Sequence, residues 1–148
     1  MIHISKYMAA SLVTFLNVTT RDEALNALVD LLDHDKKLQN RKTFYDAIMD
    51  RERIVSTGIG MGVAIPHAKL YPCDDFFIAI AVLQFGVEWK ALDNAPVRLI
   101  FMIGGPDDKQ TEYLQILSAL TFAIKDEERR KKILTSNSKE AIIRLFTN

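Results

Sequence analysis

The sequence is poor in the features that mark several large classes of protein. It has one cysteine, Cys73, so an internal disulfide is excluded, which fits a reducing cytoplasm. Its 19 lysine and arginine residues are balanced by 19 aspartate and glutamate residues, and a net charge of zero provides no attraction for nucleic acid or an anionic membrane. No apolar run approaches the roughly 20 residues that a membrane helix needs. We therefore expect one cytoplasmic domain over residues 1–148, without nucleic acid as a partner and without direct membrane insertion.

The sequence also lacks the common cofactor and metal motifs. The glycine-rich stretch 58–62 has neither the third glycine of a dinucleotide loop nor the lysine of a P-loop at the required spacing. The histidines His3, His34 and His67 lie far apart, without metal-ligand spacing, and His34 is expected to be solvated. The apolar stretch after Lys6 is not followed by a signal-peptide cleavage site. None of these motifs therefore indicates a function.

Helical periodicity in the apolar residues, which make up 49% of the chain, predicts five helices. In chain order these are 21–38 with Thr20 as its cap, 41–53 with Asn40 as its cap, a helix capped by Asp107 or Asp108 that reaches about Ile124, 127–134 and 138–146. The buried stripe of the third helix is expected to be Leu114, Leu117, Leu120 and Ile124. The predicted helices therefore lie on either side of a central segment without a helical period.

The central segment has the pattern of buried strands. Residues 76–85 and 97–103 are each apolar with one polar exception, which suits strands that are covered on both faces. Gly104, Gly105 and Pro106 are expected to end the second run. Residues 61–65 are short, apolar and predicted to be extended. The order of helices, strands and helices predicts a three-layer α/β/α sandwich.

The stretch 51–67 contains three glycines and ends at His67, and Pro66 restricts the backbone directly before that histidine. If the strand is extended up to His67, the imidazole emerges in line with buried residues. Imidazole suits phosphoryl transfer because a neutral ring nitrogen is available near pH 7. Arg51 carries a planar donor fork that can stabilise phosphoryl oxygens. The alternatives are a structural histidine, an arginine that only favours a helix C-terminus, and a nucleophilic Cys73–His67 pair.

This stretch closely resembles the IIA proteins of the phosphoenolpyruvate-dependent phosphotransferase system (PTS), in the fructose-mannitol branch, which includes the nitrogen-related regulatory IIA proteins. The matching residues are Arg51-Glu52, Ser56-Thr57-Gly58-Ile59-Gly60 and Gly62-Val63-Ala64-Ile65-Pro66-His67. The resemblance continues through Pro96-Val97-Arg98-Leu99-Ile100-Phe101 and through Tyr113-Leu114. It therefore spans nearly the whole chain, and we expect residues 1–148 to be a single EIIA type-2 domain.

The resemblance implies a mixed sheet between helices, phosphorylation of His67 and stabilisation of the phosphate by Arg51. It implies the histidine phosphocarrier protein as the donor, and as the acceptor or target a IIB protein or a regulated kinase or transporter. It implies no metal and no organic cofactor.

The sequence departs from the family pattern at Tyr113. Many family members carry a second histidine at this place, before a leucine. A tyrosine can donate a hydrogen bond to a phosphoryl oxygen, but it carries protons poorly near neutral pH. Tyr113 either lines the site or packs in the core, and Ser56 and Thr57 either bond near the site or only terminate local structure. The departure puts onward transfer in doubt more than the phosphorylation of His67.

Three functions remain open from the sequence. The first is a regulatory module whose partners depend on the phosphorylation state of His67, since a phosphoryl group adds roughly two negative charges. The second is a sugar-specific IIA component that passes phosphate to a IIB protein. The third is a degenerate domain that is no longer phosphorylated. The loss of the second histidine favours the regulatory role, and the intact motif around His67 argues against degeneration.

Overall fold

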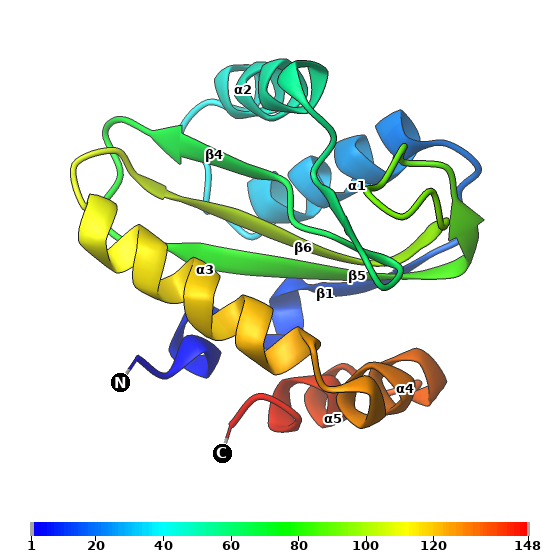
Figure 1. Ribbon diagram of the computed structural model, residues 1–148. Coiled ribbons are helices and arrows are strands. Elements are labelled where there is room, and N and C mark those ends of the chain that lie inside the picture. The colour runs from blue at the N-terminus through cyan, green and yellow to red at the C-terminus, as the bar shows by residue number, and fades with distance from the viewer. Residues whose placement is uncertain (1, 148) are drawn as a thin grey trace.

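The computed structural model describes residues 2–147, and within them one six-stranded mixed sheet lies between two layers of helices (Figure 1). In chain order the elements are the 3₁₀ helices η1 (Ile4–Tyr7) and η2 (Ala10–Leu12), then β1 (Val13–Leu16), α1 (Arg21–His34), α2 (Arg41–Ile54), β2 (Gly58–Gly60), β3 (Val63–Ala64), β4 (His67–Leu70), β5 (Phe77–Val87), β6 (Val97–Pro106), α3 (Gln110–Ile124), α4 (Glu127–Thr135) and α5 (Lys139–Arg144). The predicted α/β/α sandwich with a mixed sheet is confirmed.

Strand β6 organises the sheet. The strand order is β1-β5-β6-β3-β2, and β4 also pairs with β6 beyond the end of β3. Strand β6 runs antiparallel to β5 and parallel to both β3 and β4. In this register His67, the first residue of β4, lies beside Ile103. The predicted reactive histidine therefore lies on a short strand that pairs with β6, a long strand in which nine of ten residues are buried.

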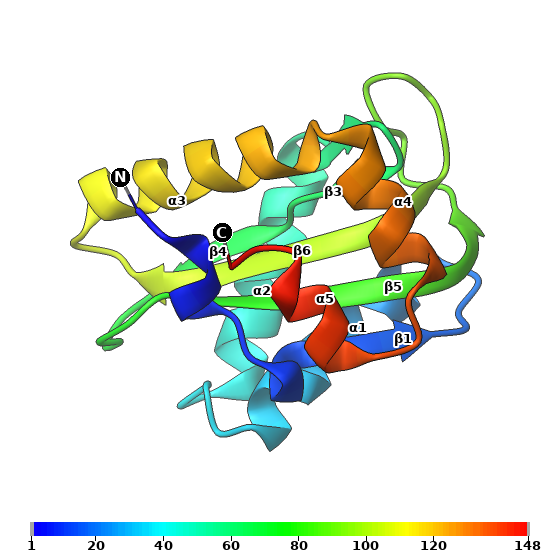
Figure 2. The same ribbon diagram turned by 90° about the horizontal axis from the view of Figure 1, so that it is seen from below.

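The two faces of the sheet bury separate cores. Helices α1 and α2 cover one face, with Leu25, Leu28 and Phe44 fully buried there. Helices α3, α4 and α5 cover the other face together with η1, as the view from below shows (Figure 2). Because β5 and β6 lie between these layers, most of their residues are buried, as their apolar runs predict, and the exception is residues 84–86 of β5, which are exposed.

The predicted caps of the first two helices are confirmed. The Thr20 hydroxyl accepts from the Glu23 backbone N–H, and Glu23 accepts in return from the Thr20 backbone N–H, which forms a capping box. The Asn40 side chain accepts from the Thr43 N–H. Helix α1 nevertheless ends at His34 rather than near 38, because Lys36 adopts a left-handed backbone with φ of 61°.

Two predictions for α3 are wrong. Neither predicted aspartate caps the helix, because Lys109 occupies the N-cap position and makes no capping hydrogen bond with its side chain. Leu114 is 52% exposed and does not belong to the buried stripe. The buried residues are instead Tyr113, Ile116, Leu120 and Ile124. Apolar residues occur around much of α3, so periodicity alone did not determine which ones face the sheet.

The central strands differ from the prediction at their ends. Residues 61 and 62 form a turn instead of an extended segment, so β3 contains only Val63 and Ala64. Strand β6 continues through Gly104, Gly105 and Pro106 because β4 pairs with it there. A Cβ on Gly105 would lie 2.1 Å from the ring of Phe76, so the close approach of that ring requires glycine.

The N-terminal segment folds as part of the domain. Strand β1, which the sequence analysis did not predict, pairs in parallel with β5 and places Val13 beside Ile80. Four residues carry too weak a pattern to identify the strand without its partner. Across residues 2–147, no helix has both the length and the apolar character required to cross a membrane.

Candidate functional site

His67 is held in one orientation by the backbone that leads to it. Its Nδ1 lies 3.1 Å from the carbonyl oxygen of Ile65. Because a carbonyl oxygen only accepts, Nδ1 carries the proton, and in the neutral ring Nε2 keeps its lone pair. Pro66 is buried, and its carbonyl accepts from the Ile103 N–H at 2.9 Å. The segment 65–67 therefore presents Nε2 as the ring nitrogen available for reaction.

The surroundings of His67 favour its neutral form. Burial is the largest cause that lowers the pKa of His67 below its ordinary value. The hydrogen bond to Ile65 and the negative charge of Glu52 act in the opposite direction, whereas the positive charges of Arg51 and Lys69 lower the pKa further. At neutral pH the imidazole is therefore uncharged and nucleophilic.

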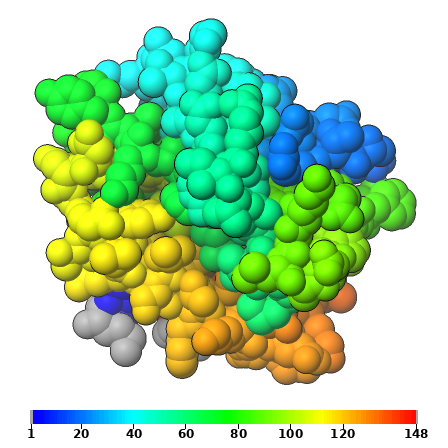
Figure 3. Space-filling model, turned by 45° about the horizontal axis from the view of Figure 1, so that its top comes forward, coloured from blue at the N-terminus to red at the C-terminus, as the bar shows by residue number. Residues whose placement is uncertain are grey.

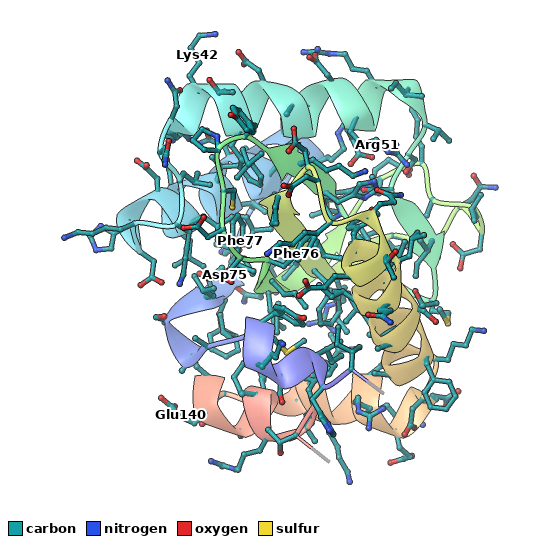
Figure 4. All side chains as sticks on the ribbon, turned by 90° about the vertical axis from the view of Figure 1, so that its left-hand side faces the viewer. Lys42, Arg51, Asp75, Phe76, Phe77 and Glu140 are labelled. Carbon is teal, nitrogen blue, oxygen red and sulfur yellow. The ribbon has the colours of Figure 1, made fainter. Side chains whose placement is uncertain are left out.

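Arg51 lies in the last turn of α2 and is partly buried. Its Nη1 donates to the carbonyl oxygen of Val55 at 2.8 Å, which fixes one end of the guanidinium. In Figure 4 Arg51 lies on α2 above the ribbon of α3. Its charge acts on both His67 and Tyr113, so the structure brings these three predicted site residues together.

Lys69 is a second cation beside His67, and the sequence analysis did not identify it. It lies two residues after His67 on β4, so the two side chains share one side of the strand. Its Nζ lies 5.3 Å from the centre of the Tyr113 ring and donates to the side chain of Gln110. The alternation of a strand could have revealed this pairing if β4 had been predicted.

The ring of Tyr113 is buried beside His67. The ring centre lies 5.8 Å from that of His67 and 6.3 Å from that of Phe76, onto which it stacks. Burial raises the pKa of the Tyr113 hydroxyl, so it remains a hydrogen-bond donor at neutral pH. No side chain or carbonyl within residues 2–147 bonds to this hydroxyl. Tyr113 therefore packs in the core and also lines the site.

Ser56 and Thr57 are held by a buried polar network. The carboxylate of Glu52, which is 3% exposed, accepts from the Thr57 N–H at 2.7 Å and from its hydroxyl at 2.6 Å. The Thr57 hydroxyl in turn accepts from Nε1 of Trp89 at 3.2 Å. The Ser56 hydroxyl donates to the Trp89 carbonyl at 2.6 Å. Both side chains therefore hold the loop after α2 in place, and the sequence analysis missed Glu52 and Trp89 as their partners.

The turn before β3 has an unusual backbone. Gly60, Met61 and Gly62 have φ values of 96°, 62° and 74°, all in the left-handed region. Asp93 fixes the turn, because its carboxylate accepts from the Met61 N–H at 3.0 Å. The Gly62 carbonyl accepts from the backbone N–H groups of residues 98 and 99. Glycine is required on both sides of Met61, and the Met61 side chain is left exposed at the surface.

The other candidate residues lie apart from this site or have partners elsewhere. Cys73 is a partly buried free thiol in the loop after β4, and burial raises its pKa, which disfavours the thiolate. His34 is exposed at the end of α1. Within residues 2–147, no three side chains of histidine, cysteine, aspartate or glutamate are grouped to hold a metal ion. Of these candidates, His67 is the one that lies beside Tyr113 and within the charge of Arg51 and Lys69.

Known proteins resemble this chain over most of its length. A family model for the phosphoenolpyruvate-dependent sugar phosphotransferase system, EIIA 2, matches residues 6–148. The fructose-specific EIIABC component of Bacillus subtilis is 37% identical over 130 residues, which are 86% of this chain and 20% of that protein. The fructose-specific EIIA component of Haloferax volcanii is 35% identical over 123 residues, covering 83% of this chain and 80% of that protein.

Solved structures show the same architecture. The nitrogen regulatory protein IIA-Ntr of Neisseria meningitidis superposes with a TM-score of 0.91 at 26% identity, over 97% of this chain and 99% of that one. The Escherichia coli complex of mannitol enzyme IIA with phosphorylated IIB gives a TM-score of 0.79 at 19% identity, over 93% of this chain and 95% of that one. At this identity the similarity supports a shared fold and nothing more. With the family match over residues 6–148, these findings show that the chain belongs to the EIIA 2 family, the phosphotransfer components of the phosphoenolpyruvate-dependent sugar phosphotransferase system.

Proposed function

We propose that this protein is a phosphocarrier that accepts a phosphoryl group on Nε2 of His67 from the histidine phosphocarrier protein. One observation carries the proposal. The Ile65 carbonyl accepts from Nδ1, so the neutral ring exposes a lone pair only at Nε2. Burial and two cations keep that ring neutral. A fixed, uncharged imidazole is the form that attacks phosphorus.

In the proposed step, the Nε2 lone pair forms a bond to phosphorus while the phosphorus–nitrogen bond in the donor breaks. The electron pair of the broken bond returns to the imidazole of the donor. The ring of His67 becomes positively charged, and its Nδ1–H remains bonded to the Ile65 carbonyl, which stabilises that charge. No proton has to leave the protein during the transfer.

Arg51 and Lys69 are proposed to stabilise the oxygens of the transferred group. Both cations lower the pKa of His67, so both lie near enough to repel a proton from the ring. The same positive field attracts a phosphoryl group, which carries roughly two negative charges. The unpartnered hydroxyl of Tyr113 is placed to donate a further hydrogen bond to it.

The surface around these residues suits a protein partner. Exposed apolar side chains occur at the end of α2, in the turn before β3 and on α3; they are Ile54, Val55, Met61, Leu114 and Phe122. Helix α2, the segment after it and α3 adjoin on one face of the molecule (Figure 3). Apolar residues around a polar centre are typical of protein interfaces. We propose that this face receives the donor and, in turn, the acceptor.

We further propose that the protein is regulatory, with the phosphorylation state of His67 selecting its target, a kinase or transporter. The tyrosine at 113, where many family members carry a histidine, is in keeping with this role, because its hydroxyl can donate a hydrogen bond but carries protons poorly near neutral pH. The structural similarity to a nitrogen regulatory protein is in keeping with it. The alternative is transfer to a sugar-specific IIB protein, which the names of the fructose-specific relatives favour.

The test is incubation with phosphoenolpyruvate, enzyme I and the histidine phosphocarrier protein, followed by intact mass spectrometry at alkaline pH. We expect a gain of one phosphate in the wild type and none in His67→Ala. The exposed His34 provides a matched control, since His34→Ala should be phosphorylated normally. Phosphate on the His67→Ala variant would refute the assignment.

Adding a fructose-specific IIB protein to the phosphorylated form separates the two roles. Rapid loss of phosphate from this protein with gain on IIB would support sugar transport. A phosphorylated form that persists would support regulation.

A further inference from the structure

We propose that Glu52 is a positioning residue of the phosphoryl-transfer site, acting on His67 through a continuous chain of hydrogen bonds. The inference rests on the proposed function. Glu52 itself cannot touch a donor protein or a phosphoryl group, because it is 3% exposed and both its oxygens are bonded to Thr57. Besides the field of its charge at His67, it can therefore influence the site only through the groups that it bonds.

The chain of hydrogen bonds has three links. Glu52 accepts from the N–H and the hydroxyl of Thr57 at 2.7 and 2.6 Å. The Thr57 carbonyl accepts from the Ile65 N–H at 3.0 Å. The Ile65 carbonyl accepts from Nδ1 of His67 at 3.1 Å. Each link fixes the backbone that makes the next one, so the carboxylate determines where the acceptor for Nδ1 lies.

The same loop also holds the guanidinium beside the site. Arg51 donates to the carbonyl oxygen of Val55, two residues before Thr57. Releasing Thr57 from Glu52 therefore loosens the supports of both Arg51 and His67. A displacement of about 1 Å in a reacting group costs as much as about 100-fold in rate. One buried carboxylate thus controls two groups that would act together on the phosphoryl group.

Trp89 shows that Thr57 is held from both sides. Its indole Nε1 donates to the Thr57 hydroxyl, which in turn donates to Glu52. Capping the end of a helix would not need a tryptophan from a segment 32 residues away in the chain. The arrangement instead fixes the orientation of the hydroxyl and aligns the first link of the chain.

The test uses three substitutions and one control. Glu52→Gln keeps the shape of the side chain but removes its charge and one acceptor oxygen. Thr57→Val removes the hydroxyl link and leaves the charge, and Thr57→Ser retains both bonds. Glu140→Gln makes the same chemical change at an exposed residue on α5, at the opposite side of the molecule from Arg51 (Figure 4). Far-ultraviolet circular dichroism reports whether each variant is folded; Trp89 fluorescence does not serve this purpose, because its indole bonds to Thr57.

Two readouts are needed. The first is the kcat and KM for phosphoryl transfer from the histidine phosphocarrier protein. The second is the ¹⁵N spectrum of the His67 ring in the unphosphorylated protein, which distinguishes the Nδ1–H from the Nε2–H tautomer. In a variant that stays folded, a purely structural role of Glu52 would leave the His67 tautomers unchanged. Because Glu52 is buried, its substitution should also leave KM for the donor protein unchanged.

We expect Glu52→Gln to lower kcat by about 10- to 100-fold with KM unchanged, and to mix the His67 tautomers. Thr57→Val should show a smaller loss of the same kind, whereas Thr57→Ser and Glu140→Gln should match the wild type. A folded Glu52→Gln variant with wild-type kcat and tautomer would overturn the proposal. A slow Glu52→Gln beside an unaffected Thr57→Val would also overturn it, because the charge would then act directly.

The ¹⁵N spectrum keeps this proposal separate from the phosphocarrier function. If the wild type takes up no phosphate, the proposed function fails. The His67 tautomers measured in Glu52→Gln and Thr57→Val then test the chain of hydrogen bonds independently of phosphoryl transfer. If Glu52→Gln does not fold, Thr57→Val carries both readouts.

Discussion

The two sides of His67 are built differently. On the α2 side, the contacts are directional hydrogen bonds: Arg51 donates to the Val55 carbonyl, and Thr57 donates to the buried carboxylate of Glu52. On the α3 side, the wall is aromatic: Tyr113 stacks on Phe76, and Phe76 meets Tyr7 edge to face with ring centres 6.4 Å apart. The polar side depends on a few directional hydrogen bonds, whereas the aromatic side shares its contacts among several rings.

This difference determines how each side should respond to change. A hydrogen bond to a charged group is lost entirely when its donor is removed. When a substitution disturbs packed rings, the free energy of unfolding falls by an amount that grows with the steric clash. The neighbouring site moves only as far as the rings themselves are displaced. We therefore expect changes on the polar side to affect transfer, and changes on the aromatic side to affect stability first.

Replacing Arg51 with alanine should give the largest effect. The variant loses the guanidinium that is proposed to stabilise the phosphoryl oxygens, so phosphoryl uptake should slow by about 100- to 1,000-fold. The free energy of unfolding should change little, because Arg51 is only partly buried. Rapid-quench kinetics with the phosphorylated donor measures the rate. An unchanged rate would mean that Arg51 only stabilises the C-terminal end of α2 through its bond to the Val55 carbonyl.

Gly105→Ala tests the aromatic side. The new Cβ would lie 2.1 Å from the Phe76 ring, which must move against Tyr113 and Tyr7. Overpacking of this kind costs about 1–3 kcal/mol in the free energy of unfolding. Urea denaturation followed by circular dichroism measures that loss. If phosphoryl uptake falls while stability stays at the wild-type value, the contrast between the two sides is wrong.

Tyr113→Phe separates packing from hydrogen bonding on the aromatic side. The ring remains in its stack, and only the unpartnered hydroxyl is lost. A single neutral hydrogen bond is worth about 0.5–1.5 kcal/mol, so uptake should slow by about 2- to 10-fold with stability unchanged. The companion variant Tyr113→His introduces an imidazole that can donate to a phosphoryl oxygen, so we expect its uptake to stay close to the wild-type rate. Equal rates for all three proteins would limit Tyr113 to packing.

The sequence was most informative where the signal is local. Thr20 and Asn40 bond to residues three positions away, and the two long strands contain apolar runs with one polar exception each. The role of Glu52 was missed because it depends on Trp89, and that of Lys69 because β4 is defined by its pairing with β6. Such contacts between distant segments leave no periodic pattern.

The smallest predicted effect concerns the dependence of stability on pH. His67 has a lowered pKa in the folded state, so between that value and about 6.5 the unfolded chain binds the additional proton. The contribution of His67 is therefore fully present above about pH 6.5 and is lost as the pH falls toward the folded pKa. Denaturation of the wild type and His67→Gln over this range should show a steeper decline for the wild type. Parallel curves would mean that the pKa of His67 is the same in both states.

The lengths of the strands have a consequence for motion. Strands β5 and β6 have 11 and 10 residues, whereas β3 has two and β4 has four. Amide protons of β4 should therefore exchange with solvent through local opening, whereas those of β6 should exchange only when the whole domain unfolds. A visiting protein could then reshape the edge that bears His67 and leave the rest of the sheet intact. His67 would then lie on a short strand that opens locally, while the long strands β5 and β6 stay folded.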